Sequence, residues 1–150
     1  MMGQIFRAAF LGAGVWVAAT TAVLAQQTPD TLPDNIVAEL NTAAANNSDP
    51  AAYASAVAGI VAANPDLASS IAAKAVETRP GAAVALAQAI APVVTNPTIA
   101  ASVLTSIVSA LPAADKATVT ATVVNTYADH APPTVVNNPV FAAAEGTAVA

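Results

Sequence analysis

A proline that recurs at nearly even spacing is the feature that most constrains this chain. Five prolines follow one another at nearly equal intervals: Pro50, Pro65, Pro80, Pro97 and Pro112. Proline suits the first turn of a helix, where its missing N–H would have no partner, and it cannot continue the preceding helix undisturbed. The segments between these prolines are rich in Ala, Val, Ile and Leu. The spacing therefore predicts about six short helices joined by very tight turns.

Capping residues place the ends of these helices. Asp49, Asn64 and Asn96 each precede one of the prolines, and Asp and Asn are favoured N-cap residues. Pro92 should end or bend the fourth helix near Ala91 and leave residues 93–95 irregular. The run 118–124 alternates with period two and is β-branched, as in a strand, but its length and proline spacing match its neighbours, so we expect a helix there. The predicted helices are 34–46, 50–63, 65–79, 80–91, 97–111 and 112–128.

The helical segments form a degenerate repeat. Asn64-Pro65-Asp66-Leu67-Ala68 and Asn96-Pro97-Thr98-Ile99-Ala100 share one pattern, and the distance between them along the chain is that of two helices with their turns. Large aliphatic residues fall six or ten residues after a proline, on one stripe of each helix. We therefore expect an all-α fold of antiparallel helical hairpins, stacked as a small bundle or a short α-solenoid. The stripe residues are Ile71, Leu86 and Val103 at the first offset, and Ile60, Ile90 and Ile107 at the second.

Composition divides the chain into four parts. Residues 1–25 have one basic residue, Arg7, then a continuous apolar run and small residues before Gln26, which is typical of a cleaved secretory signal peptide. An uncleaved membrane anchor is the alternative, since the apolar run from Ala8 to Ala25 is just long enough to span a bilayer. Residues 26–33 are interpreted as a polar leader and 34–130 as the helical-repeat domain. The Pro/Ala-rich composition of residues 131–150 predicts an extended or disordered tail.

Two helices have unusual surfaces. The predicted fourth helix has Gln88 as its only strongly polar side chain between Gly81 and Val94, so it should be central in the bundle or lie at a subunit contact. The predicted fifth helix carries an uncharged stripe of hydroxyl side chains opposite its aliphatic face. This stripe is most simply a solvent-exposed face, with a surface for carbohydrate or for another copy of the protein as alternatives. Its members are Thr98, Ser102, Thr105 and Ser109.

The sequence predicts no catalytic, metal-binding or cofactor-binding residues. His130 is the only histidine and lies beside Asp129 near a predicted helix end, which suits a solvent-exposed residue better than a general base. Asp49, Asp66 and Asp115 lie near helix starts, where capping and the helix dipole explain them. There is no cysteine, so thiol chemistry and cysteine–zinc sites are excluded. We therefore expect a protein that is not an enzyme and needs no cofactor.

Charge narrows the choice of partners. Removal of the signal peptide would remove Arg7, one of the four basic residues. The remaining chain has three basic and nine acidic residues, which gives a net charge of −6. Three scattered cations cannot neutralise a row of phosphates, so we expect no nucleic-acid partner, and no docking on anionic lipid. The expected protein is exported to the periplasm or beyond the cell. There it would be a non-catalytic structural or interaction module of the cell envelope or extracellular matrix.

Two kinds of partner remain open for such a module. The first is a second copy or another envelope or matrix protein, because a helix that is apolar all round needs a partner to bury it. The alternative is an apolar ligand held between helices, which would make the protein a carrier or chaperone. No integral membrane segment is expected once the signal peptide has been removed.

Overall fold

Helices make up nearly all of the residues that the structure describes. This computed structural model describes residues 32–150, so the predicted signal peptide (1–25) and most of the predicted polar leader (26–33) lie outside the described residues. Eight α-helices and no strand are found in residues 32–150, which confirms the prediction of an all-α small bundle. The α-helices are α1 (Asp34–Asn46), α2 (Pro50–Ala63), α3 (Ala68–Thr78), α4 (Ala83–Ile90), α5 (Pro97–Ala110), α6 (Ala113–His130), α7 (Pro133–Val136) and α8 (Pro139–Val149).

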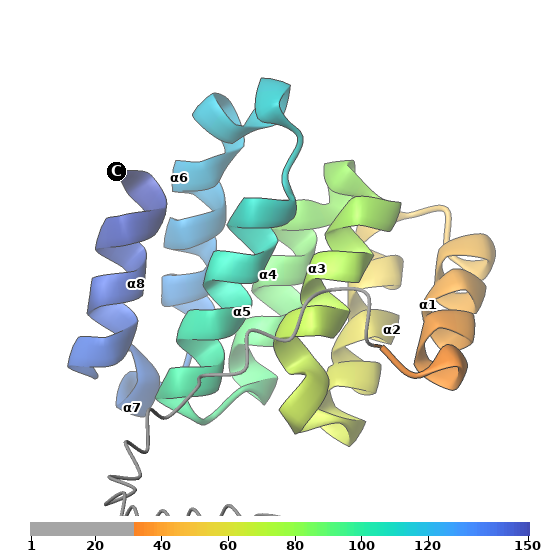
Figure 1. Cartoon of the computed structure of the whole chain (residues 1–150), viewed down its shortest axis with the longest axis horizontal. Coiled ribbons are helices and arrows are strands. Elements are labelled where there is room, and N and C mark those ends of the chain that lie inside the picture. Colours follow the sequence, from red (N-terminus) through yellow and green to blue (C-terminus); the bar gives the residue numbers. More distant parts are fainter. Residues whose placement is uncertain (1–31) are drawn as a thin grey trace, which may run out of the picture.

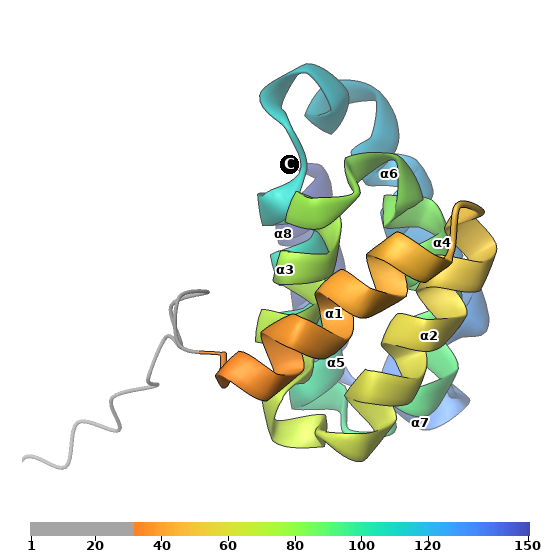
Figure 2. The ribbon, with the colours of Figure 1, turned by 90° about the vertical axis from the view of Figure 1, so that its right-hand side faces the viewer.

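The helices are arranged in two layers (Figure 1). α3, α5 and α8 lie side by side in one layer, and α2, α4 and α6 lie side by side in the other. Successive helices alternate between the layers, so that α2–α3, α4–α5 and α6–α8 form three hairpins stacked along the long axis. α1 crosses α2 and α3 at one end of the stack, and α8 lies at the other end (Figure 2). The architecture is therefore that of a small all-α bundle in two layers.

Pro50 and Pro97 are the first residues of α2 and α5, as the sequence predicts. Pro139 likewise begins α8, in a segment where no helix is predicted. The Asp or Asn before each of them accepts a hydrogen bond from a backbone N–H of the first turn, at 2.9 to 3.1 Å. Each such cap satisfies a donor that would otherwise have no partner at the helix start. Local chemistry thus sets where these three helices begin.

Other helix starts differ from the prediction. Pro65 and Pro80 each open a single 3₁₀ turn, η2 (Pro65–Leu67) and η3 (Pro80–Ala82), before α3 and α4 proper. The predicted N-cap role of Asn64 is wrong, because its side-chain amide donates instead to the Ile60 carbonyl at the end of α2. Asn64 is the single residue between α2 and η2, and its side chain bonds to the C-terminal end of α2.

The two segments of ambiguous sequence are also resolved. α4 ends at Ile90 and passes into the 3₁₀ turn η4 (Ala91–Val93), followed by three residues without regular structure, as Pro92 predicts. The β-branched run 118–124 lies within α6, so the expected helix is confirmed there. Its two adjacent valines, Val123 and Val124, are buried against the stack, and this packing outweighs the local strand preference.

The large aliphatic residues of the predicted stripe form the core. Five of the six are fully buried and Ile60 is half-buried. α4 lies between α2 and α6, which confirms the prediction that the fourth helix is central. It is not buried all round, since Gln88 faces solvent. Three aromatic side chains join the aliphatic core and are also fully buried: Tyr53, Tyr127 and Phe141.

The prediction of an extended or disordered tail over residues 131–150 is wrong. α7 and α8 lie in this segment, and α8 packs on α5 and α6. Phe141 is fully buried, with its ring centroid 5.7 Å from that of Tyr127 on α6. The proline-rich composition hides a capped helix start at Asn138–Pro139, and one aromatic side chain supplies enough buried area to dock the helix.

Arg79 fastens α1 to the rest of the stack. It directly follows α3, and its guanidinium reaches back to carbonyl oxygens at the end of α1. It donates to the Ala44 carbonyl at 2.7 Å and to the Asn47 carbonyl. The guanidinium also lies over the Tyr53 ring, 5.1 Å from its centroid. One side chain therefore satisfies the C-terminus of α1 and packs on the core at the same time.

Candidate functional site

The residues with possible catalytic chemistry lie apart from one another. The carboxylate of Asp49 caps α2, Asp66 lies in η2, and Asp115 lies in the first turn of α6. His130 is exposed at the end of α6, and its Nδ1 lies 2.8 Å from the Thr126 carbonyl oxygen. Within residues 32–150 no three His, Asp or Glu side chains are close enough to hold a metal ion. Capping and helix-end roles account for these four residues.

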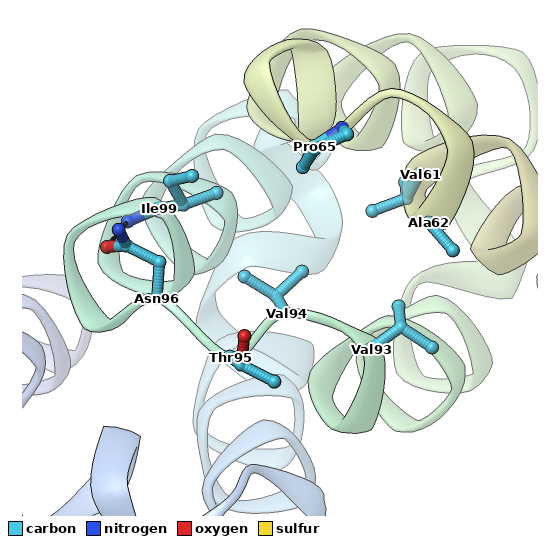
Figure 3. A pocket seen from close by; sticks show the side chains of 8 residues that line it. All are labelled: Val61, Ala62, Pro65, Val93, Val94, Thr95, Asn96 and Ile99. Carbon is cyan, nitrogen blue, oxygen red and sulfur yellow. Dashed lines mark hydrogen bonds between the residues drawn. The ribbon is translucent and has the colours of Figure 1, made fainter.

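A small apolar pocket lies where two turns of successive hairpins meet (Figure 3). Val61 at the end of α2 and Pro65 of η2 line it on one side. Val93 and Val94 of the α4–α5 turn and Ile99 of α5 line it on the other. Its volume is about 80 Å³. Pockets that take drug-sized or lipid-like ligands have about 300–1,000 Å³. This pocket is too small for the occupant that the carrier alternative requires.

No single helix in residues 32–150 combines the length and the hydropathy needed to cross a membrane. The pair Pro50–Ala63 and Pro65–Thr78 reaches the necessary length and hydropathy only together, and it bends by 117° at the intervening turn. In the stack this pair is the α2–α3 hairpin, and most of its apolar side chains belong to the core.

Helices α1 and α8, at the two ends of the stack, expose different kinds of side chain. At the first end, most side chains that α1 exposes are polar, including Asp34, Glu39 and Asn41. At the other end, the exposed residues of α8 are apolar or small, apart from one threonine. That residue, Thr147, has its hydroxyl bonded within the helix, to the Ala143 carbonyl at 2.9 Å. The exposed residues of α8, here called the outer side of α8, are Pro139, Val140, Ala142, Ala143, Gly146, Thr147 and Val149.

The outer side of α8 holds two of the three large hydrophobic side chains that are exposed in the described residues. Val140 is 49% exposed and Val149 is 56% exposed, and the third is Val93 at 40%. The Tyr127 hydroxyl beneath α8 is buried and has no hydrogen-bond partner among the described residues, and burial raises the pKa of this phenol well above its ordinary value. On α8 itself, partial burial raises the pKa of the Glu145 carboxyl.

A groove with hydroxyl side chains lies between α3 and α5. Its volume is about 230 Å³. Its polar lining consists of five hydroxyls and one carboxylate: Ser69, Ser70, Thr105, Ser106, Ser109 and Glu77. We call this feature the hydroxyl groove. The predicted stripe on α5 is exposed along its length, and its second half, Thr105 and Ser109, lines the groove whereas Thr98 and Ser102 do not.

Comparison of the chain with protein-family models, with curated proteins and with solved structures finds no match. Function must therefore be inferred from the surfaces described above. Sequence reasoning missed the outer side of α8, because residues 131–150 were interpreted as a tail. The Asn138–Pro139 pair was the available signal, since it repeats the Asn-Pro pair that stands before α3 and α5. The groove was not predicted because half of its lining lies on α3, and the hydroxyl stripe of α5 does not indicate which residues of another helix face it.

Proposed function

We propose that this protein is an exported, non-catalytic helical-repeat module of the cell envelope or extracellular matrix, and that it self-associates through the outer side of α8. The predicted signal peptide supports export, and the scattered positions of the acidic residues and His130 support a structural role. The observation that carries the proposal is the difference between the side chains that α1 and α8 expose at the two ends of the stack.

A stacked helical repeat needs a polar surface on each terminal unit to remain soluble, because inner units bury both of their faces against neighbours. α1 supplies such a surface at one end, with its exposed Asp, Glu and Asn side chains. The last hairpin exposes polar residues of α6, among them Lys116 and Asn125, but the exposed residues of α8 are almost all apolar or small. An exposed apolar helix at the end of a stack marks a surface that a further partner covers.

A second copy of this chain is the neighbour that the surfaces favour. The residues of the outer side of α8 carry no charge, and the one acidic residue of α8, Glu145, is half-buried beside them, so two copies with net charge −6 bring only this carboxylate near the contact. Stacking α8 onto the far end of another copy would bury the acidic residues Asp34 and Glu39 of α1 against an apolar surface. The favourable contact is therefore α8 against α8, which closes as a two-fold dimer rather than growing into a filament.

The size of α8 limits how tight this dimer is. Its 11 residues give a helix about 16 Å long, and one helix pair buries less than the ~1,200 Å² of a standard stable interface. We therefore expect a weak dimer with a dissociation constant on the order of tens to hundreds of micromolar. Alanine and glycine on the contact side allow the two helix axes to approach to about 8 Å, the lower end of the usual range.

Sedimentation analysis of the chain from residue 26 onward, over a wide concentration range, tests the proposal. The weight-average mass should rise toward that of a dimer with increasing concentration. Val140→Glu and Val149→Glu should each abolish this rise, because dimerisation would bury a charge. Val93→Glu is the matched control, since this valine is also exposed but lies on η4, away from α8, and should leave the dimer intact. A monomer at every concentration, or loss of the dimer with Val93→Glu alone, would refute the proposal.

A further inference from the structure

The hydroxyl groove has one buried polar side chain in its wall, that of Ser70. Ser70 is only 5% exposed and, apart from the tyrosines, is the single polar side chain that is buried in residues 32–150. Among the described residues the Tyr127 hydroxyl is the only enclosed side-chain polar atom without a hydrogen-bond partner, so the Ser70 hydroxyl is open to the groove rather than sealed in the core. The groove therefore has a hydroxyl donor and acceptor in its wall.

The charges around the groove favour a neutral ligand. Glu77 is the only charged side chain in its lining, so the lining offers an anionic ligand a carboxylate and no cation. The Glu77 carboxylate is already paired with the Lys74 ammonium at 3.2 Å, so a cationic ligand would have to displace an internal partner. The remaining polar groups are hydroxyls, and each can both donate and accept a hydrogen bond.

The shape and the apolar part of the lining restrict the ligand further. Besides its polar groups the groove is lined by Ala73 and Ala110, whose methyl groups offer small apolar contacts. Its volume of about 230 Å³ lies below the roughly 300–1,000 Å³ of pockets for drug-sized ligands. A ligand of this size with hydroxyls at its edge and C–H groups on its face is a single sugar ring.

We propose that the hydroxyl groove binds one neutral sugar residue, either as a free monosaccharide or as a unit of a neutral polysaccharide. The Ser70 hydroxyl and the hydroxyls of Ser69, Ser106 and Ser109 exchange hydrogen bonds with the sugar hydroxyls, and the two alanines contact its C–H face. The Thr105 hydroxyl already donates to the Ala101 carbonyl at 2.9 Å, so it acts as an acceptor only. This inference is independent of self-association, because the groove lies between α3 and α5 and none of its lining belongs to α8.

Amide chemical shifts of the ¹⁵N-labelled chain from residue 26 onward test the site. The probes are glucose, galactose, mannose and N-acetylglucosamine, each to about 50 mM, since weak ligands of this size bind in the millimolar range. Dextran as a second arm distinguishes a free sugar from a polysaccharide unit. At least one probe should cause saturable shifts confined to α3 and α5 around the groove.

Two substitutions and their controls make the test specific. Ser109→Leu fills the groove from an exposed position and should weaken binding about tenfold or more, which corresponds to about 1.4 kcal/mol. Ser102→Leu makes the same change on the same helix outside the groove and should leave binding unchanged. Ser70→Ala should weaken binding severalfold while the protein stays folded. Val140→Glu should bind as the wild type does, which separates this site from dimerisation.

Three results would overturn the sugar site. The first is the absence of saturable shifts with every probe, and the second is binding that Ser109→Leu and Ser102→Leu weaken equally. The third is saturable binding of a Ser/Gly-rich peptide in the groove when none of the sugars binds, which would assign the groove to a polypeptide partner.

Discussion

Phe141→Ala is expected to release α8 from the stack while the rest of the protein stays folded. Phe141 is the only fully buried residue of α8, so this one ring supplies most of the area that docks the helix. A buried aromatic side chain removes about 150–250 Å² from water, worth about 4–6 kcal/mol at ~25 cal/mol per Å². Phe→Ala substitutions in cores cost about 3–5 kcal/mol. A loss of about 4 kcal/mol lowers the protection of the α8 amides by up to about a thousandfold.

Hydrogen exchange followed by mass spectrometry distinguishes local release from global destabilisation. The α8 amides should exchange rapidly in Phe141→Ala, whereas those of α2, α3 and α4 should keep most of their protection, because these helices do not contact Phe141's helix extensively. Val140→Ala is the control on the adjacent residue, which is 49% exposed, and should change stability by less than about 0.5 kcal/mol. A uniform loss of protection in all helices, or unchanged protection of α8, would show that α8 is not docked by this single ring.

The remaining predictions concern the two buried tyrosines and Arg79. Tyr127→Phe should raise the free energy of unfolding by about 1 kcal/mol, because it removes a buried hydroxyl with no partner in the described residues. Tyr53→Phe should lower it by about 1 kcal/mol, because the Tyr53 hydroxyl donates to the Ala75 carbonyl at 3.1 Å. Urea denaturation of both variants checks this, and changes of the same sign would contradict it. Arg79→Met should cost about 2–3 kcal/mol, since it removes charged hydrogen bonds to Ala44 and its neighbours and the contact with the Tyr53 ring. Arg79→Lys should recover less than half of this loss, because an ammonium cannot reproduce the planar fork of the guanidinium, and equal stability of the Lys variant and the wild type would show that the fork is unimportant.

Helix positions were largely predictable because the signals for them are local. The prolines at 50 and 97, each preceded by a capping side chain, place the starts of α2 and α5 without any knowledge of their neighbours. Pro92 ends α4 for the same reason, since a missing N–H acts on its own helix. The aliphatic stripe likewise indicated the core, because its residues recur on one side of each helix.

The docking of residues 131–150 could not be predicted from composition. The docking of α8 depends on the contact between Phe141 and Tyr127. Tyr127 lies on α6, and α7 with its two flanking turns separates the two helices in the chain. The reach of Arg79 to α1 is a further case, because its acceptors Ala44 and Asn47 are 35 and 32 residues away in the chain. Contacts of this kind depend on how the hairpins stack, and no local signal reports them.

The amino-acid sequence by itself determined where the helices begin and end, which side of each is apolar, and that chemistry based on cysteine is absent. The tertiary structure alone decided which surfaces remain uncovered. The outer side of α8 is exposed because α8 is the last unit of the stack, and the hydroxyl groove exists because small side chains of α3 and α5 face each other across a gap. Helix formation depends on neighbours three or four residues away, whereas exposure depends on which helices meet in space, and that is why the candidate sites became visible only in the folded protein.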